Sequence, residues 1–284
     1  MDDLRPSPIA GRWYPGQAND LRREVDDYLA AAPPLEAPPA DRVVGLLAPH
    51  AGLMYSGPVA AYAFRSVQGA RVDVVAVVCP SHFHADGPAL TSGHQGYVTP
   101  LGVVPVDRAV LDQVRAELGA NLGLPPERAL VEIRHDQEHA IEIELPFLQR
   151  SLGAEFSLLP IMLRDQSDEM ALALGQALAR ALAGRRALLV ASSDLSHYFA
   201  QPQAEQLDAE MLRQVEALDP SGVLATQAAG RGQACGPGVI AAVLWAARAL
   251  GADRARVVRH ATSGDVSGDF DQVVGYGAAV VWKN

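Results

Sequence analysis

The sequence is short of cysteine and has no long apolar run, and both shortages narrow what the protein can be. Two cysteines in 284 residues cannot form a disulfide framework, so we expect a reducing compartment and predict a cytoplasmic location. The most apolar stretches, such as GVIAAVLWAA, fall well short of the roughly 18 residues that a membrane span needs. The start, MDDLRPSPIAGRWYPG, is acidic and interrupted by proline, which is not typical of a signal peptide.

Positive charge is also scarce, and several cofactor motifs are missing. Lys and Arg together number 23 against 33 Asp and Glu, and no basic cluster lies beside exposed aromatics. Nucleic acid and anionic membranes are therefore not expected as partners. No G-x-G-x-x-G follows the first strand, and neither G-x-x-x-x-G-K-[ST] nor G-x-S-x-G occurs. Dinucleotide, P-loop and serine-hydrolase chemistry thus lack their usual signals.

The overall amino-acid composition is typical of a globular protein with a large buried core. With 49% hydrophobic and 20% charged residues, the chain is expected to form one α/β domain over residues 1–284. Only residues 30–41 are proline-rich and of low complexity, and they are predicted to form an extended connector after an N-terminal helix.

Apolar runs without polar alternation predict strands that are covered on both faces. The expected strands are residues 43–48, 72–79, 156–163, 187–192, 256–262 and 273–282. Amphipathic patterns between them predict helices over residues 57–67, 107–118, 139–152, 167–182, 202–218 and 236–250. This alternation predicts a three-layer α/β/α fold with a mostly parallel central sheet. Residues 88–107, broken by Gly and Pro, predict a small β-hairpin extension beside it.

Polar side chains follow three of the predicted strands. His50 and His82 each come shortly after a strand and a proline, and the loop SSDLSHY supplies Asp194 and His197. Ligands in open α/β sheets bind at the carboxyl ends of the strands, so these side chains are expected to meet at one rim. Each residue also has a structural explanation, because a histidine can brace a loop and Asp194 can cap a helix or form an Asx turn.

Cys235 lies in a glycine-rich loop before a predicted helix. The unpaired N–H groups and the dipole at a helix start favour a thiolate, which binds metals or attacks electrophiles. An alternative is therefore metal-independent thiol hydrolysis, with His197 as base and Asp194 as its orienting group. Cys79 lies inside an apolar strand and is interpreted as a small core residue.

The stretch HDQEH matches the H-x-x-E-H pattern of inverted zinc peptidases. On a helix His135 and His139 would share a face, with Glu138 as base. Because apolar periodicity starts only after the motif, the alternative is that Glu138 and His139 support the rim and its ligand. His84 and His94 stand in glycine-flanked loops and are interpreted as surface residues.

Several phrases, in order along nearly the whole chain, resemble those of the Memo family, which includes protein B of the AmmeMemoRadiSam system. They are AGRWYPG, APHAGLMYSG, CPSH, EHAIEIELPFL, SSDLSHY, ACGPG and GYGAAVVW. The resemblance implies a fold similar to that of class III extradiol dioxygenases, which hold non-haem iron at the strand-end rim. His50 and His82 match the two family metal-ligand histidines, and Cys235 matches the cysteine that joins them.

The resemblance also implies roles for residues around the metal. His197 occupies the place of the dioxygenase acid-base histidine with Asp194 beside it, and Tyr55 would line the pocket. A cysteine replaces the carboxylate ligand of the dioxygenases, and a thiolate is softer and also suits copper(I) or zinc. Iron(II) is the first expectation, copper the second and zinc the third.

The leading hypothesis is a metal-dependent oxidoreductase or dioxygenase-like redox protein that takes a small-molecule or peptide ligand in the rim pocket. The alternative is a non-catalytic module that binds a peptide or partner. For either, the resemblance implies radical-SAM and Amme-type proteins as partners.

Overall fold

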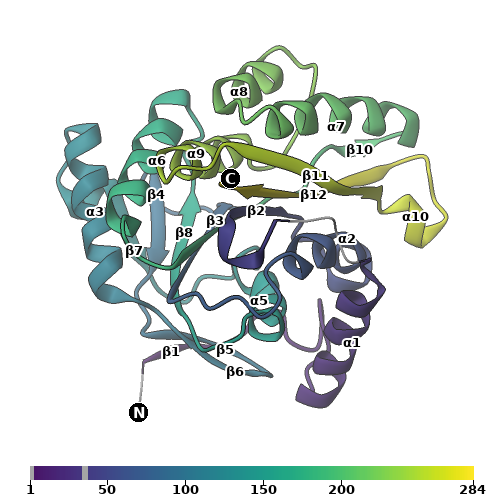
Figure 1. The fold of residues 1–284 in the computed structure, drawn as a ribbon, viewed down its shortest axis with the longest axis horizontal. Helices are drawn as coiled ribbons and strands as arrows, with labels where there is room; N and C mark the ends of the chain where they lie inside the picture. The colour runs from purple at the N-terminus through teal and green to yellow at the C-terminus, as the bar shows by residue number, and fades with distance from the viewer. Residues whose placement is uncertain (1–2, 34–37) are drawn as a thin grey trace.

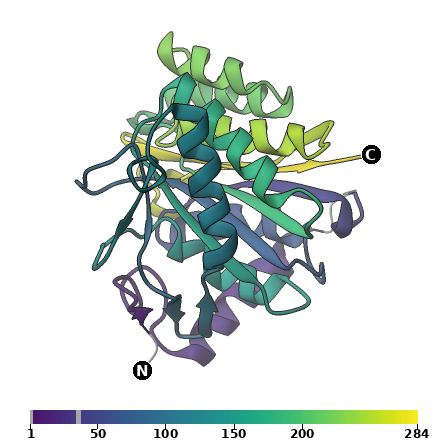
Figure 2. The ribbon, with the colours of Figure 1, turned by 90° about the vertical axis from the view of Figure 1, so that its left-hand side faces the viewer.

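The computed structural model describes residues 3–33 and 38–284 and consists of a large curled sheet with helices on both faces (Figures 1 and 2). Helices α1, α2 and α5 cover one face, and α3, α6, α7, α8 and α9 lie over the other. Their bounds are Ala18–Ala31 (α1), Leu53–Arg65 (α2), Arg108–Leu122 (α3), Leu145–Ser151 (α5), Asp168–Leu182 (α6), Gln201–Glu216 (α7), Pro220–Ala228 (α8) and Pro237–Ala249 (α9). In the part of the chain that the structure describes, none of the helices combines the length and hydropathy needed to cross a membrane.

The large sheet has the strand order β10-β12-β2-β9-β3-β8-β4-β7, and β11 pairs with β12. Its strands are Val43–Ala48 (β2), Val74–Pro80 (β3), Ala89–Ser92 (β4), Leu130–Ile133 (β7), Ser157–Leu163 (β8), Ala187–Ser192 (β9), His197–Phe199 (β10), Arg254–Thr262 (β11) and Val273–Trp282 (β12). The four central strands, β2, β9, β3 and β8, run parallel and are almost entirely buried.

The sheet is mixed rather than mostly parallel, which corrects the prediction. Strand β12 pairs antiparallel with β2. Strands β10 and β11 both pair antiparallel with β12. At the other side β4 runs antiparallel to β8. An apolar run indicates a strand covered on both faces but not the direction in which it runs, so the runs identified the central strands and the antiparallel β12 alike.

The segment predicted as a hairpin extension divides between two sheets. Strand β4 belongs to the large sheet, whereas β5 (Gly96–Thr99) and β6 (Gly102–Pro105) form an antiparallel hairpin. Strand β1 (Leu4–Arg5) pairs with β5 and completes a three-stranded sheet. This small sheet holds the N-terminal segment against the residues that precede α5, where Arg5 donates to Asp136 and to the carbonyl of Glu138. Figure 1 shows β5 below α5.

The predicted helices differ from the observed ones mainly at two places. Helix α2 begins four residues before the expected start, with Pro58 in its interior. The helix expected over 139–152 is replaced by a short 3-10 turn (η2, Glu142–Glu144) followed by α5. Of the connector predicted over 30–41, residues 34–37 lie outside the described part, and the remainder includes the end of α1 and the start of a 3-10 turn (η1, Ala40–Arg42). The remaining short helices are α4 (Pro126–Ala129) and α10 (Gly264–Ser267).

Candidate metal centre

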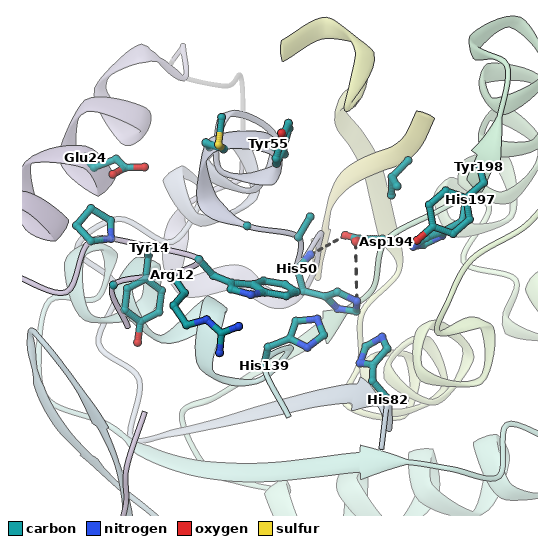
Figure 3. A pocket seen from close by; sticks show the side chains of 17 residues that line it. Arg12, Tyr14, Glu24, His50, Tyr55, His82, His139, Asp194, His197 and Tyr198 are labelled. Atoms are coloured by element: carbon teal, nitrogen blue, oxygen red, sulfur yellow. Dashed lines mark hydrogen bonds and ion pairs between the residues drawn. The ribbon is translucent and has the colours of Figure 1, made fainter. Parts of the chain in front are cut away.

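Three side chains from distant segments converge beyond the carboxyl ends of the central strands, and Figure 3 shows two of them, His50 and His82. His50 follows β2, His82 follows β3, and Cys235 lies just before α9. Parallel strands end at the same edge, so the loops after β2 and β3 meet there. One donor atom from each of the three residues lies within 4.8 Å of the other two. Sγ of Cys235 is 3.3 Å from Nε2 of His50, and the two imidazole centroids are 5.1 Å apart.

His50 is held so that one ring nitrogen faces the cluster. Its Nδ1 lies 3.0 Å from the hydroxyl of Ser192, which also contacts Glu144 Oε1 at 2.8 Å. The backbone N–H of His50 donates to Asp194 Oδ1 at 2.7 Å. Burial lowers the pKa of His50 to about 3, so its ring is neutral at ordinary pH. A neutral ring with Nδ1 engaged has Nε2 available as an electron-pair donor.

His82 is oriented by a buried carboxylate. Glu138 Oε1 lies 2.9 Å from Nδ1 of His82, and Oε2 accepts the backbone N–H of the same residue at 2.8 Å. Although burial opposes ionisation, the hydrogen bond from His82 lowers the pKa of Glu138 to about 2. Burial likewise opposes charge on His82, but the hydrogen bond to Glu138 raises its pKa. Carboxylate-to-histidine contacts of this kind are typical around metal ligands.

The thiol of Cys235 has an environment different from the predicted one. Burial raises its pKa, and the nearby charge of Asp194 raises it further, whereas the sequence favoured a thiolate. Helix α9 begins at Pro237, as expected from the sequence, but the sulfur just before it is buried, and the cost of burying a charge outweighs the effect of the helix start. The backbone N–H of Asp194 donates to the sulfur at 3.2 Å. Without a metal ion the raised pKa keeps the thiol protonated. A bound metal cation would reverse this, because a coordinating thiol loses its proton.

Asp194 and His197 lie on the same wall but do not form the predicted pair. Asp194 binds the backbone of His50, and burial raises its pKa to about 6. Nδ1 of His197 lies 2.9 Å from the carbonyl of Leu195, which therefore orients the ring. Among the contacts of the described residues, the imidazole nearest to Cys235 is that of His50. The arrangement expected for thiol hydrolysis by Cys235 and His197 is accordingly not the one observed.

The HDQEH stretch does not form the helix that the zinc-peptidase interpretation requires. Residues 135–139 are irregular, and His135 has a left-handed φ of 59°. His139 is close to His82, with ring centroids 4.6 Å apart, whereas His135 faces His94 at 5.8 Å. Glu138 and His139 thus lie beside His82, and their role in supporting the rim stays a prediction. His94 is 3% exposed and not a surface residue, because β1 and Asp3 cover it, whereas His84 is exposed.

A cavity of about 710 Å³ opens above the cluster. His50, His82 and His139 lie at its base in Figure 3, and Tyr55, Asp194 and His197 line its walls. The N-terminal turn adds five residues to this cavity, and none of them had been predicted as a site residue. They are Gly11, Arg12, Trp13, Tyr14 and Pro15. Their only signal was the phrase AGRWYPG, whose position in space depends on contacts with residues far along the chain.

Comparison with known proteins agrees with this architecture. The family model described as Memo-like protein matches residues 5–280. The chain belongs to the Memo-like family. A MEMO1 family protein of Nitrosopumilus maritimus is 33% identical over 97% of this chain and 98% of the relative. The corresponding protein of Methanosarcina mazei is 35% identical over 98% and 99%, and that of Methanococcoides burtonii 36% over 98% and 100%.

The Memo-like match includes every residue of the cluster and of the cavity walls. The relatives are similar over their full length, so the N-terminal turn that closes one side of the cavity lies inside the shared region. Membership in the Memo-like family therefore applies to the whole site.

Proposed function

We propose that this Memo-like chain binds one transition-metal ion through His50, His82 and Cys235. The supporting observation is the convergence of three donor atoms within 4.8 Å, from segments separated by up to 185 residues. Both imidazoles have Nδ1 in hydrogen bonds, which leaves each Nε2 to a ligand. The resemblance to the class III extradiol dioxygenases puts iron(II) first, and the thiolate also suits copper, with zinc third.

The function that this site supports best is that of a metal-dependent redox protein with a fold like that of class III extradiol dioxygenases. The ion, when bound, would act as a Lewis acid and exchange electrons. His197 would take or give a proton at Nε2, because its Nδ1 is committed to Leu195. Asp194 would hold the His50 backbone, and the cavity walls would exclude water from a bound ligand. The proposal includes that residues 1–284 form a single domain and that the protein works in the cytoplasm.

Metal content tests the proposal directly. Protein purified anaerobically and loaded with iron(II) or copper is expected to retain about one ion per chain. The reason is that the two groups of possible ligands in the described part of the chain, one of His50, His82 and Cys235 and the other of His82, Glu138 and His139, share His82. His50→Ala and Cys235→Ala should lose that ion, whereas Cys79→Ala and His84→Ala, matched changes outside the cluster, should keep it. Unchanged stoichiometry in His50→Ala and Cys235→Ala would refute the assignment.

A second candidate is a non-catalytic module that binds a peptide or a partner protein. The cavity of about 710 Å³ has room for a peptide side chain as well as for a small molecule. Radical-SAM and Amme-type proteins are the expected partners. A chain that stays metal-free after loading yet co-purifies with such a partner would favour this candidate over the redox protein.

A further inference from the structure

Arg12 is a cation without a counter-charge in the wall of the main cavity. Within residues 3–33 and 38–284, no carboxylate lies within ion-pair distance of its guanidinium, and no side-chain hydrogen bond engages it. The other ordinarily charged side chains of the wall, apart from histidines, are Glu24 and Asp194. In a chain of net charge −10, Arg12 is the only lysine or arginine among the described residues that line the cavity, so an anion would find a matching charge there.

The backbone around Arg12 is firmly placed. Gly11 has a φ of 78°, its N–H donates to the carbonyl of Tyr14 at 2.8 Å, and the N–H of Trp13 donates to Ile9 at 2.9 Å. The Trp13 carbonyl in turn accepts the N–H of Leu53, at the start of α2. The turn is therefore a fixed part of the wall, and Arg12 is presented from a rigid base.

This turn is also coupled to the metal cluster. The indole of Trp13 lies against His139, with ring centroids 4.2 Å apart, and His139 lies against His82. Arg12 directly precedes Trp13 in the sequence. Figure 3 shows Arg12 on the same side of the cavity as His139. A molecule that touches both the guanidinium and the cluster would thus cross an aromatic wall formed in part by Trp13.

We propose that Arg12 is the anion-binding residue of this cavity and that the ligand of the site is an aromatic carboxylate. Its carboxylate would pair with the guanidinium fork, and its ring would lie among the aromatic walls. The walls include Trp13, Tyr14, Tyr55 and Tyr198. The cavity wall carries one guanidinium and two carboxylates, Glu24 and Asp194, so a ligand with one negative charge is repelled less than a phosphate with two. A carboxylate is therefore favoured over a phosphoryl group. The inference deepens the proposed function and rests on it only for the role of the ligand at the metal.

Paired probes that differ in charge alone test the inference. Dissociation constants of 3-phenylpropionate, its neutral amide 3-phenylpropanamide, and phenyl phosphate would be measured by NMR titration of the full chain, with and without iron(II). A charge-assisted pair should make the carboxylate bind about tenfold more tightly than the amide. Arg12→Met, which keeps the apolar stem, should bring the two probes to within about twofold. Arg22→Met, an exposed arginine of α1 outside the cavity wall, should keep the tenfold difference.

The outcomes separate this inference from the metal proposal. Equal affinity for the carboxylate and the amide in the wild-type chain, or a preference that survives in Arg12→Met, overturns the role of Arg12. Tighter binding of phenyl phosphate than of the carboxylate overturns the ligand class. A charge preference that depends on Arg12 in a chain that retains no iron supports the inference while the metal assignment fails.

Discussion

Glu138 holds His82 at two points, through Nδ1 of the ring at 2.9 Å and through the backbone N–H at 2.8 Å. The same carboxylate accepts the N–H groups of His139 and Ala140, at 2.9 and 3.0 Å. One buried side chain thereby sets the ring orientation of a proposed ligand and the course of the loop before η2. The loop and the cluster are consequently parts of one hydrogen-bonded unit.

Replacing this carboxylate should weaken metal binding while the fold persists. In Glu138→Gln the amide retains an acceptor oxygen but not the negative charge that favours a proton on Nδ1 of His82. We expect about a 10–100-fold loss of iron(II) affinity, the range typical for such supporting carboxylates. Competition titration with a chelator measures it. Glu132→Gln, at an exposed ion pair, is the control, and equal affinities in the two variants would contradict the assignment.

Cobalt(II) should reveal whether the sulfur of Cys235 is a ligand. A cobalt–thiolate bond gives a charge-transfer absorption that imidazole ligands do not, so the loaded wild-type chain is expected to show this band. Cys235→Ser should lose the band and bind cobalt more weakly. Cys79→Ser is the matched control, because that thiol is buried in β3, and the band should remain. A wild-type spectrum without the band would argue against a cobalt–sulfur bond.

Sequence reasoning succeeded where local pattern determines structure. The strands at 43–48, 187–192 and 273–282 have the predicted bounds, because a segment covered on both faces must be apolar along its whole length. The same pattern predicted that polar residues after three of the expected strands meet at one rim. His50 and His82, which follow two of those strands, and Cys235, which was selected from its place before a helix, lie together.

Sequence reasoning failed where long-range contacts determine the outcome. The helix expected from residue 139 starts later, because Glu138 is drawn to His82, and Arg5 donates to its carbonyl at 2.6 Å. His94 was predicted to lie on the surface. In the structure its ring contacts Asp3, about ninety residues earlier in the sequence, next to where β1 pairs with β5. The pKa of Cys235 follows its burial rather than its position before α9. None of these contacts is encoded by periodicity or spacing.

Because of Glu144, the free energy of unfolding of the chain should fall as the pH rises. Burial raises its pKa well above the ordinary value, so the folded chain keeps a proton that the unfolded chain loses above about pH 4.5. Stability from this group falls by about 1.4 kcal/mol per pH unit between the unfolded and the folded pKa. Glu144→Gln, a neutral substitute that can still contact Ser192, should therefore be more stable than the wild type at pH 8 and little different at pH 4.

Urea unfolding of the metal-free proteins at pH 4, 6 and 8 measures this difference. Glu155→Gln, at an exposed position, should follow the wild type at each pH. A gap between Glu144→Gln and the wild type that does not grow with pH would show that Glu144 is ionised in the folded chain.

Arg5 should be among the most costly residues to replace. It is 1% exposed, lies 2.7 Å from Asp136 and 2.8 Å from Glu142, and joins the N-terminal segment to the loop that carries Glu138. Arg5→Met leaves two buried carboxylates without their cation, and the expected loss in the free energy of unfolding is about 3–5 kcal/mol. Urea denaturation measures it, with Arg22→Met on the surface expected to change stability by less than about 0.5 kcal/mol.

The double variant Arg5→Met with Glu142→Gln identifies the origin of that loss. If the cost comes from uncompensated charge, neutralising Glu142 should recover part of it, and the two changes together should cost less than their sum. Strict additivity would instead mean that Arg5 stabilises mainly through packing, for example its guanidinium over the ring of Tyr97 at 4.7 Å. In the first case, the ion pairs of Arg5 with Asp136 and Glu142, and not its apolar packing, hold the N-terminal segment that includes Arg12 next to the metal centre.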